Sequence, residues 1–259
     1  MRIKKKYPKI SIVTPSFNQG KFIKETIDSI LDQKYSNLEY WIIDGGSTDE
    51  TVNILKSYGK KIKWISEKDK GQTNAINKGI KKTTGDIIMY LNSDDVMMPN
   101  TLNVVAQYFM QHPDAMWLTG DYFIIDENGK KIQSFIANYK KLLRKYPSFN
   151  VFSIANFIIQ PSTFWKKEIH DEFGLFDEKL KYCMDYDFWM KIYKKYKLHV
   201  LKKHFSLFRI HSLSKGGSQY KKQFVEEHQV CKKYNKNPLI LFLHKIHAFL
   251  IVSAYKIIK

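Results

Sequence analysis

The stretch ISIVTPSFN at residues 10–18 joins a short β-branched run to a turn of proline, hydroxyl and aromatic residues. Helical spacing of apolar residues follows at residues 22–31, and Ser47 with Glu50 three residues later predicts a capping box and a helix to about residue 58. Strands that alternate with helices are typical of a parallel sheet with crossover helices. Residues 1–120 are therefore predicted to form an α/β half, with further strands at residues 40–43, 62–65 and 87–91.

The alternation breaks after residue 115. Residues 115–125 and 131–136 flank Asp126-Glu127-Asn128-Gly129 and predict a β-hairpin with an Asn-Gly turn. Beyond residue 138 the sequence is more aromatic and irregular, with a short strand expected after residue 163 and a helix at residues 185–196. No Pro/Ser-rich linker separates the halves, so residues 121–218 are expected to belong to the same domain.

The charge balance predicts attraction to phosphate-bearing partners. Lys and Arg number 43 against 25 Asp and Glu, a net charge of +18 that suits nucleic acid, an anionic membrane or a nucleotide diphosphate. The lysines are scattered, so a merely solvated surface is an equal alternative, and no nucleic-acid-binding module is recognisable. Cys183 and Cys231 lack CxxC spacing, and no signal-peptide pattern follows the basic N-terminus. A cytoplasmic protein without a disulfide framework or zinc site is expected.

Residues 219–259 are predicted to form a helical tail. Its last part, from Pro238, is apolar almost all round, but His244 and Lys245 interrupt it before it reaches the length of a membrane span. One alternative is a helix packed on the domain or on a partner chain. The other is an interfacial helix on the inner face of the plasma membrane. Its lipid-facing side would carry Phe242, Ile246 and Phe249, and its head-group side would carry Lys245, Lys256 and Lys259.

Polar residues stand where the first two predicted strands end, and ligands of open α/β sheets bind at such carboxyl ends. Thr14-Pro15-Ser16-Phe17 places hydroxyls and an aromatic ring where a nucleobase could stack, although alone it is an ordinary strand-to-helix turn. Asp44, followed by Gly45-Gly46, could accept a hydrogen bond from a base ring NH. The alternative is that Asp44 and Ser47 only order the turn and cap the helix.

The fourth predicted strand ends in Asn92-Ser93-Asp94-Asp95. Two adjacent carboxylates where an apolar run stops suit a hard cation that bridges diphosphate oxygens. Adjacent aspartates also occur in ordinary caps and loops, so the pair indicates a metal site only in combination with the other segments.

Taken in order, the segments at residues 14–17, 44–49, 71–79 and 92–95 resemble those of the family 2 glycosyltransferases, over roughly the first 210 residues. The resemblance is greatest to bacterial enzymes that build O-antigen, capsule or related surface polysaccharides. It implies a GT-A fold: a Rossmann-like nucleotide-binding half with a mixed central sheet, an acceptor-binding and catalytic half, and C-terminal helices. It also implies a UDP or TDP sugar donor, a saccharide or lipid-linked saccharide acceptor, and inversion.

Carried over by position, Asp44 matches the family's base-contacting aspartate and Phe17 occupies the usual stacking position. Asp94 matches the aspartate near the ribose or the metal, and Asp95 the direct ligand of Mn²⁺ or Mg²⁺. Asn92 stands where many members have a further aspartate, which leaves the number of carboxylate ligands open. The other residues expected beside the donor come from the first turn and from the segment after the third strand: Thr14, Pro15, Ser16, Lys70, Asn74 and Lys78.

Two later segments complete the resemblance. Met184-Asp185-Tyr186-Asp187 resembles Glu-Asp-Tyr-Asp of relatives, so Asp185 inherits the general-base role, while Asp187 is interpreted as a first-turn helix carboxylate. Met184 replaces an acidic neighbour whose like charge could raise the pKa of the base. Arg209 and His211 match a late Arg-x-His element that closes over the diphosphate, and His211 either completes the metal shell or is simply hydrogen-bonded. A mobile loop is expected at Gly216-Gly217.

Two other functions were weighed from the sequence. A sugar-1-phosphate nucleotidyltransferase would need a Gly-rich, Arg/Lys-bearing loop near its start, which this sequence lacks. A non-enzymatic protein that binds a membrane surface or a polyanion would show salt-sensitive affinity without turnover of a sugar donor.

Overall fold

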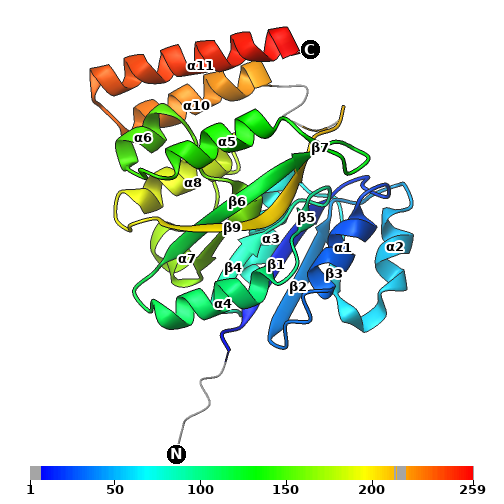
Figure 1. The fold of residues 1–259 in the computed structure, drawn as a ribbon. Coiled ribbons are helices and arrows are strands. Elements are labelled where there is room, and N and C mark those ends of the chain that lie inside the picture. The colour runs from blue at the N-terminus through cyan, green and yellow to red at the C-terminus, as the bar shows by residue number, and fades with distance from the viewer. Residues whose placement is uncertain (1–6, 213, 215–219, 259) are drawn as a thin grey trace, which may run out of the picture.

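The protein is described here from a computed structural model of residues 7–212, 214 and 220–258, in which a central sheet carries helices on both sides (Figure 1). The predicted Gly216-Gly217 loop lies outside these residues. The strands are β1 (Ile10–Ser16), β2 (Leu38–Asp44), β3 (Lys63–Ser66), β4 (Ile87–Tyr90), β5 (Val96–Met97), β6 (Trp117–Ile125), β7 (Lys131–Ile132), β8 (Thr163–Lys166) and β9 (His199–Arg209). The helices are α1 (Ile23–Leu31), α2 (Thr51–Ser57), α3 (Gln72–Lys82), α4 (Thr101–Gln111), α5 (Ser134–Leu143), α6 (Phe149–Ile154), α7 (Glu168–Phe173), α8 (Met184–Tyr193), α10 (Tyr220–Tyr234) and α11 (Pro238–Ile258).

The first half is a parallel sheet, as predicted. Strands β3, β2, β1 and β4 pair side by side in parallel. The β-branched side chains of β1, β2 and β4 are buried on both faces, whereas the edge strand β3 is only partly buried. Helix α3 lies so close to β1 that a Cβ on Gly79 would meet Val13 Cγ1 at 2.3 Å. Only glycine fits there, and this close packing fixes where α3 begins relative to the strand ends.

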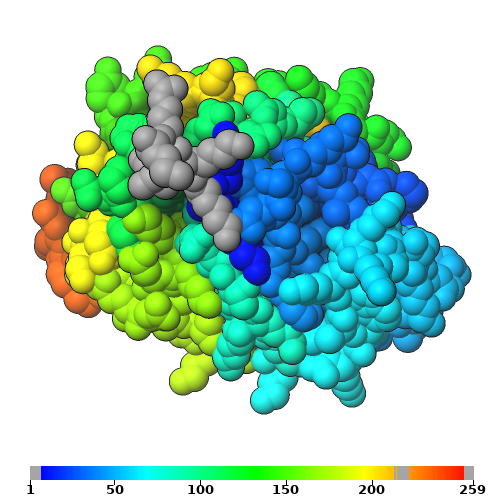
Figure 2. Space-filling view, turned by 90° about the horizontal axis from the view of Figure 1, so that it is seen from below, coloured from blue at the N-terminus to red at the C-terminus, as the bar shows by residue number. Residues whose placement is uncertain are grey.

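The second half extends the same sheet, in the order β3-β2-β1-β4-β8-β6-β9-β5 with β7 paired to β6. Strand β8 is antiparallel to β4 and β6, whereas β9 is parallel to β6, so the sheet is mixed as expected. Strand β6 runs across the predicted boundary at residue 120. Seen from below, the blue-to-cyan first half and the green-to-yellow second half meet along one continuous surface (Figure 2).

Two local predictions differ from the structure. The hairpin of β6 and β7 forms, with Gly129 at φ +82°, but its second strand ends at Ile132 and α5 begins at Ser134. The predicted capping box is wrong, because α2 begins at Thr51 and its N-cap residue makes no side-chain capping bond. Ser47 instead donates its hydroxyl to Asp44, so a contact across the turn replaces the cap.

The C-terminal helices lie on the second half, with α11 outermost (Figure 1). Helix α11 packs against α6 and α10, and the buried His244 ring donates from Nδ1 to Ser153 O at 2.9 Å. The inner face of the tail is thus packed on the domain. In the described part of the chain, none of the helices combines the length and apolarity needed to cross a membrane.

Candidate functional site

Of the four residues at the end of β1 that were expected beside the donor, three are buried and one is exposed. Thr14 is buried and bonds to Tyr40 Oη at 3.0 Å, and Pro15 is buried beside it, so both belong to the core. Phe17 is 59% exposed at the strand end. Ser16 Oγ is buried next to it and has no hydrogen-bond partner among the described residues. An exposed ring beside an unsatisfied hydroxyl is an arrangement that a base and ribose can use.

Asp44, at the end of β2, orders the turn that follows it. Its fully buried carboxylate accepts hydrogen bonds from Ser47 N at 2.9 Å, Ser47 Oγ at 2.5 Å, Gly46 N at 3.1 Å and Ser66 Oγ at 2.6 Å. Of the two alternatives for Asp44, turn ordering is therefore what the structure shows. Contact with a nucleobase would require one of these donors to move aside.

The two aspartates after β4 have different environments. Asp95 is 0% exposed, and its carboxylate accepts from Arg209 N at 2.9 Å and Asn92 Nδ2 at 3.2 Å. Burial, followed by the charge of Asp94, raises the pKa of Asp95 well above its usual range. The Asp94 side chain is 19% exposed, and its Oδ2 lies 3.1 Å from His211 Nε2. Asp94, rather than the predicted Asp95, is the more accessible carboxylate.

Arg209 differs from its predicted role at the diphosphate, because its guanidinium is buried and bonded to the protein. Nε donates to Asp94 O at 2.8 Å, and Nη2 pairs with Glu25 Oε2 at 2.5 Å. Nη1 donates to the carbonyls of Asp126 and Glu127 at 3.2 and 3.3 Å. Arg209 therefore positions the Asp94 segment.

His211 lies against the ring of Phe22, with centroids 4.8 Å apart, and its Nε2 faces Asp94. The family resemblance assigned Arg209 and His211 to one Arg-x-His element, and both contact Asp94. Among the described residues, no group of three or more His, Cys, Asp and Glu side chains is arranged to hold a metal ion. The pair of Asp94 and His211 would need further ligands from outside the protein.

The two lysines expected beside the diphosphate, Lys70 and Lys78, differ in whether they already pair with a carboxylate. Lys78 Nζ pairs with Glu67 Oε1 at 2.7 Å, whereas Lys70 is exposed just before the first turn of the helix. Asn74 Oδ1 accepts from Lys70 N at 3.4 Å and its amide donates to Glu178. Lys70 is thus the better placed cation for a phosphate.

Residues that the sequence interpretation left out connect these strand ends. Gln72 Nε2 donates to Asn92 Oδ1 at 2.7 Å, and Asn92 Nδ2 lies 3.4 Å from Gln160 Oε1. Gln160 Nε2 in turn donates to Tyr90 O at 2.6 Å. These amides hold the turn after β4 between α3 and the segment before β8, and no spacing in the sequence indicated their contacts.

Asp185 is the second residue of α8, where the positive end of the helix dipole favours a carboxylate. Burial raises the pKa of Tyr90 well above its usual range, and the charges of Asp185 and Asp95 add to this effect. The Thr73 hydroxyl of α3 donates to Sδ of the adjacent Met184 at 2.6 Å, which places the start of α8 beside α3.

A second carboxyl group acts on Asp185 from α10. Burial raises the pKa of Glu227 to about 7; Lys140 of α5 opposes this rise and the charge of Asp185 adds to it. Glu227 thus supplies a like charge near Asp185, although Met184 stands in place of the acidic neighbour of relatives. Asp187, by contrast, is a structural helix carboxylate as interpreted, since it is buried and bonded to Lys191, Lys233 and Tyr234.

The raised pKa of Glu227 predicts a pH-dependent loss of stability. Between pH about 4.5 and 7 the folded protein keeps this proton whereas the unfolded chain has lost it, so stability falls as pH rises through that range. Glu227→Gln is expected to remove this loss, so that the variant's Tm relative to wild type improves by about 3 °C or more from pH 4.5 to pH 8.

Differential scanning calorimetry at several pH values would test this, with Glu226→Gln on the same helix as the matched control. Glu226 accepts hydrogen bonds from Lys181 N and Tyr182 N near the surface, so its variant should show the wild-type pH dependence. A Tm difference for Glu227→Gln that does not change with pH would contradict the assignment.

Comparison with known proteins identifies the family. Residues 11–174 match the family model described as glycosyl transferase family 2. An uncharacterised glycosyltransferase of Rickettsia prowazekii is 29% identical over 253 residues, which cover 94% of this chain and 78% of that protein.

Solved structures show the same fold. Staphylococcus aureus TarS 1–349 in complex with UDP-GlcNAc matches with a TM-score of 0.68 at 20% identity, covering 86% of this chain and 65% of that one. The mannosyltransferase PcManGT of Pyrobaculum calidifontis, in complex with GDP-Man and Mn²⁺, matches with a TM-score of 0.72 at 16% identity, covering 96% and 75%. The chain belongs to glycosyl transferase family 2 and has a GT-A fold.

Proposed function

We propose that this glycosyltransferase moves a sugar from a UDP or TDP sugar to a saccharide or lipid-linked saccharide, with inversion, during synthesis of a bacterial surface polysaccharide. One observation carries the proposal: the partly exposed Asp94 meets His211 at the carboxyl edge of the sheet on which exposed Phe17 stands. The solved TarS complex with UDP-GlcNAc supports a nucleotide-sugar donor.

The donor would occupy the ends of β1, β2 and β4. Phe17 would stack on the base, while Ser16 Oγ, now without a partner, would bond to the base or ribose. Asp44 would accept from the base after releasing one of its four donors. Lys70, exposed before α3, would meet the diphosphate together with the first turn of that helix.

The residues after β4 fit a divalent cation, Mn²⁺ or Mg²⁺. A carboxylate and an imidazole 3.1 Å apart are suitable ligands that leave positions for diphosphate oxygens and water. A cation would also favour the charged form of the buried Asp95 carboxyl, whose pKa is raised by burial and by Asp94. When bound, the metal would neutralise charge on the departing diphosphate. Asp94 and His211 would hold it, and Asp95 would support the turn from behind.

Asp185 would act as the general base. It would take the proton from the acceptor hydroxyl while that oxygen attacks the anomeric carbon from the side opposite the diphosphate, which inverts the configuration.

The first test is a thermal-shift and calorimetric screen of UDP, TDP, GDP and CDP sugars with and without manganese. We expect metal-dependent stabilisation by one class of donor, because only that nucleotide fits the turn around Phe17 and Asp44. If none of these donors binds, the alternative of a polyanion-binding protein is favoured, and salt-sensitive affinity for polyanions would support it.

We further propose peripheral contact with an anionic membrane through the outer side of α11. Leu239, Phe242, Ile246, Phe249 and Leu250 recur at helical spacing along it, and all are exposed, Phe249 at 70%. Exposed side chains of α5 and the turn after it, Phe135, Leu142 and Tyr146, add to the apolar surface. Exposed Lys245 and the net charge of +18 complement anionic head groups.

Replacing Phe242 and Phe249 by Ser is expected to reduce binding to vesicles that contain phosphatidylglycerol by about tenfold or more. The variant lacks two exposed aromatic rings that would be buried in the lipid on binding. Co-sedimentation with anionic and with neutral vesicles would measure this. Tyr7→Ser, which changes an exposed aromatic residue just before β1, serves as the control. Equal binding of all three proteins, or none by wild type, would contradict membrane contact through this face.

A further inference from the structure

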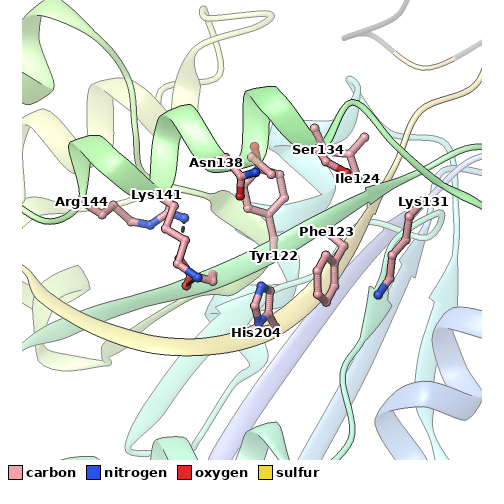
Figure 3. A pocket seen from close by; sticks show the side chains of 11 residues that line it. Tyr122, Phe123, Ile124, Lys131, Ser134, Asn138, Lys141, Arg144 and His204 are labelled. Atoms are coloured by element: carbon pink, nitrogen blue, oxygen red, sulfur yellow. Dashed lines mark hydrogen bonds and ion pairs between the residues drawn. The ribbon is translucent and has the colours of Figure 1, made fainter.

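A cavity of about 240 Å³ opens between α5 and strands β6, β7 and β9 (Figure 3). None of its lining residues belongs to the proposed donor site. Asp121 forms its inner end, where the carboxylate pairs with Arg144 Nη2 at 2.7 Å and with Lys141 Nζ at 3.3 Å. Both Asp121 and Arg144 are almost fully buried, so this end of the cavity is fixed in position.

The inner end keeps unused hydrogen-bonding capacity. Apart from its ion pair with Lys141, the buried Oδ2 of Asp121 has no hydrogen-bond partner among the described residues, and neither has Arg144 Nε. A buried acceptor without a donor is unfavourable and unusual. Asn138 of α5, which points toward Tyr122 in Figure 3, adds an amide that can both donate and accept.

An aromatic platform forms the outer part. Phe123 and His204 stack with centroids 4.0 Å apart and planes at 2°, and Lys131 Nζ lies 3.7 Å from the Phe123 centroid. His204 and Lys131 already lie against the Phe123 ring, so the His204 ring is the aromatic surface left for a ligand. A carboxylate oxygen without a hydrogen bond, an amide and this ring together suit the hydroxyls and the apolar face of a sugar.

The charges favour an anionic ligand. Three cations, Lys131, Lys141 and Arg144, line the cavity against the single carboxylate of Asp121. Burial lowers the pKa of His204, which keeps its ring neutral at neutral pH. The volume is below the roughly 300–1,000 Å³ of sites for drug-sized ligands. The cavity therefore has room for one sugar unit and excludes a whole nucleotide sugar.

We propose that this cavity binds one sugar unit that carries a carboxylate or a phosphate, as a distant part of the acceptor chain. This proposal rests on the proposed function, because it takes the acceptor to be a saccharide. The sugar hydroxyls would donate to Asp121 Oδ2 and bond to Asn138, while the anionic group would lie toward Lys141 and Lys131. The site would select acceptors by a unit remote from the hydroxyl that reacts.

Binding of glucuronate, glucose 6-phosphate, glucose and inorganic phosphate to the full chain would test this by NMR titration. We expect saturable binding of glucuronate or glucose 6-phosphate at least about tenfold tighter than that of glucose or phosphate. Whichever of the two binds more tightly identifies the anionic group. The double variant Lys131→Met, Lys141→Met should lose about tenfold or more of this affinity, while Lys145→Met, an exposed change just beyond α5, should lose none.

Three results would overturn the proposal: no saturable binding of either anionic sugar, phosphate binding as tightly as glucose 6-phosphate, or equal affinity in the double variant. Nucleotide-sugar stabilisation is measured on the same samples. Donor binding without sugar binding would reject only the cavity assignment. Sugar binding without any donor response would reject only the proposed function.

Discussion

Asp185→Asn is expected to lower kcat by about 10²- to 10⁴-fold, the range that general-base catalysis contributes. Asparagine keeps the shape and can still accept from Tyr186 N, as Asp185 Oδ1 does at 2.8 Å, but it cannot take a proton. Donor affinity should therefore remain near wild type. Single-turnover assays with the identified donor and acceptor, together with calorimetry of donor binding, would separate the two effects.

Asp171→Asn provides the control for Asp185→Asn. Asp171 is an exposed acidic residue of α7 outside the proposed site, so its change tests whether loss of one carboxylate charge is by itself enough to slow the reaction. Turnover by Asp185→Asn within about tenfold of wild type would remove Asp185 from the role of base, because a general base contributes more than that.

Asp94→Asn is expected to weaken manganese-dependent donor binding by about a hundredfold, since even indirect partners of metal ligands contribute 10- to 100-fold in affinity. Binding measured without metal should change much less. Asp95→Asn should retain metal-dependent binding within about tenfold, because the buried amide can still accept from Arg209 N. Calorimetric titration of the donor with and without Mn²⁺ would measure both variants.

The same pair of variants decides between the two assignments of the ligand. Loss of metal dependence in Asp95→Asn, with Asp94→Asn unaffected, would restore the role that the family resemblance gave to Asp95. His211→Ala is expected to weaken binding less than Asp94→Asn, because a neutral imidazole contributes less than a carboxylate to holding a hard cation. The Tm of each variant without donor shows whether the turn remains folded.

The parallel half of the sheet could be predicted because its information is local. Strands β1, β2 and β4 contain buried β-branched residues, whereas the edge strand β3 is only partly buried. The polar residues that follow these strands are brought to one edge by parallel pairing. Phe17, Asp44 and Asp94 were singled out in this way, whereas His211, which follows β9, came from the family resemblance. The failed capping box at Ser47 shows the limit, since a tertiary contact with Asp44 overrode a local signal.

The roles of Arg209 and Glu227 could not be predicted, because they depend on residues far away in the chain. Arg209 pairs with Glu25, 184 positions earlier, and no spacing indicates that partner. Glu227 acts on Asp185 only because α10 packs on α8. For the same reason the sequence could not decide between turn ordering and base contact for Asp44, since its donors include Ser66 on another strand.

The guanidinium of Arg209 has a consequence for altering donor preference in the laboratory. It joins α1 through Glu25, the turn after β4 through Asp94 O, and the β6–β7 turn through two carbonyl groups. A graft that replaced only the residues 92–95 segment with that of a relative would leave three of these four attachments in their old geometry. Chimeras that exchange all three segments together with Arg209 should keep the proposed donor site at the carboxyl edge of the sheet intact.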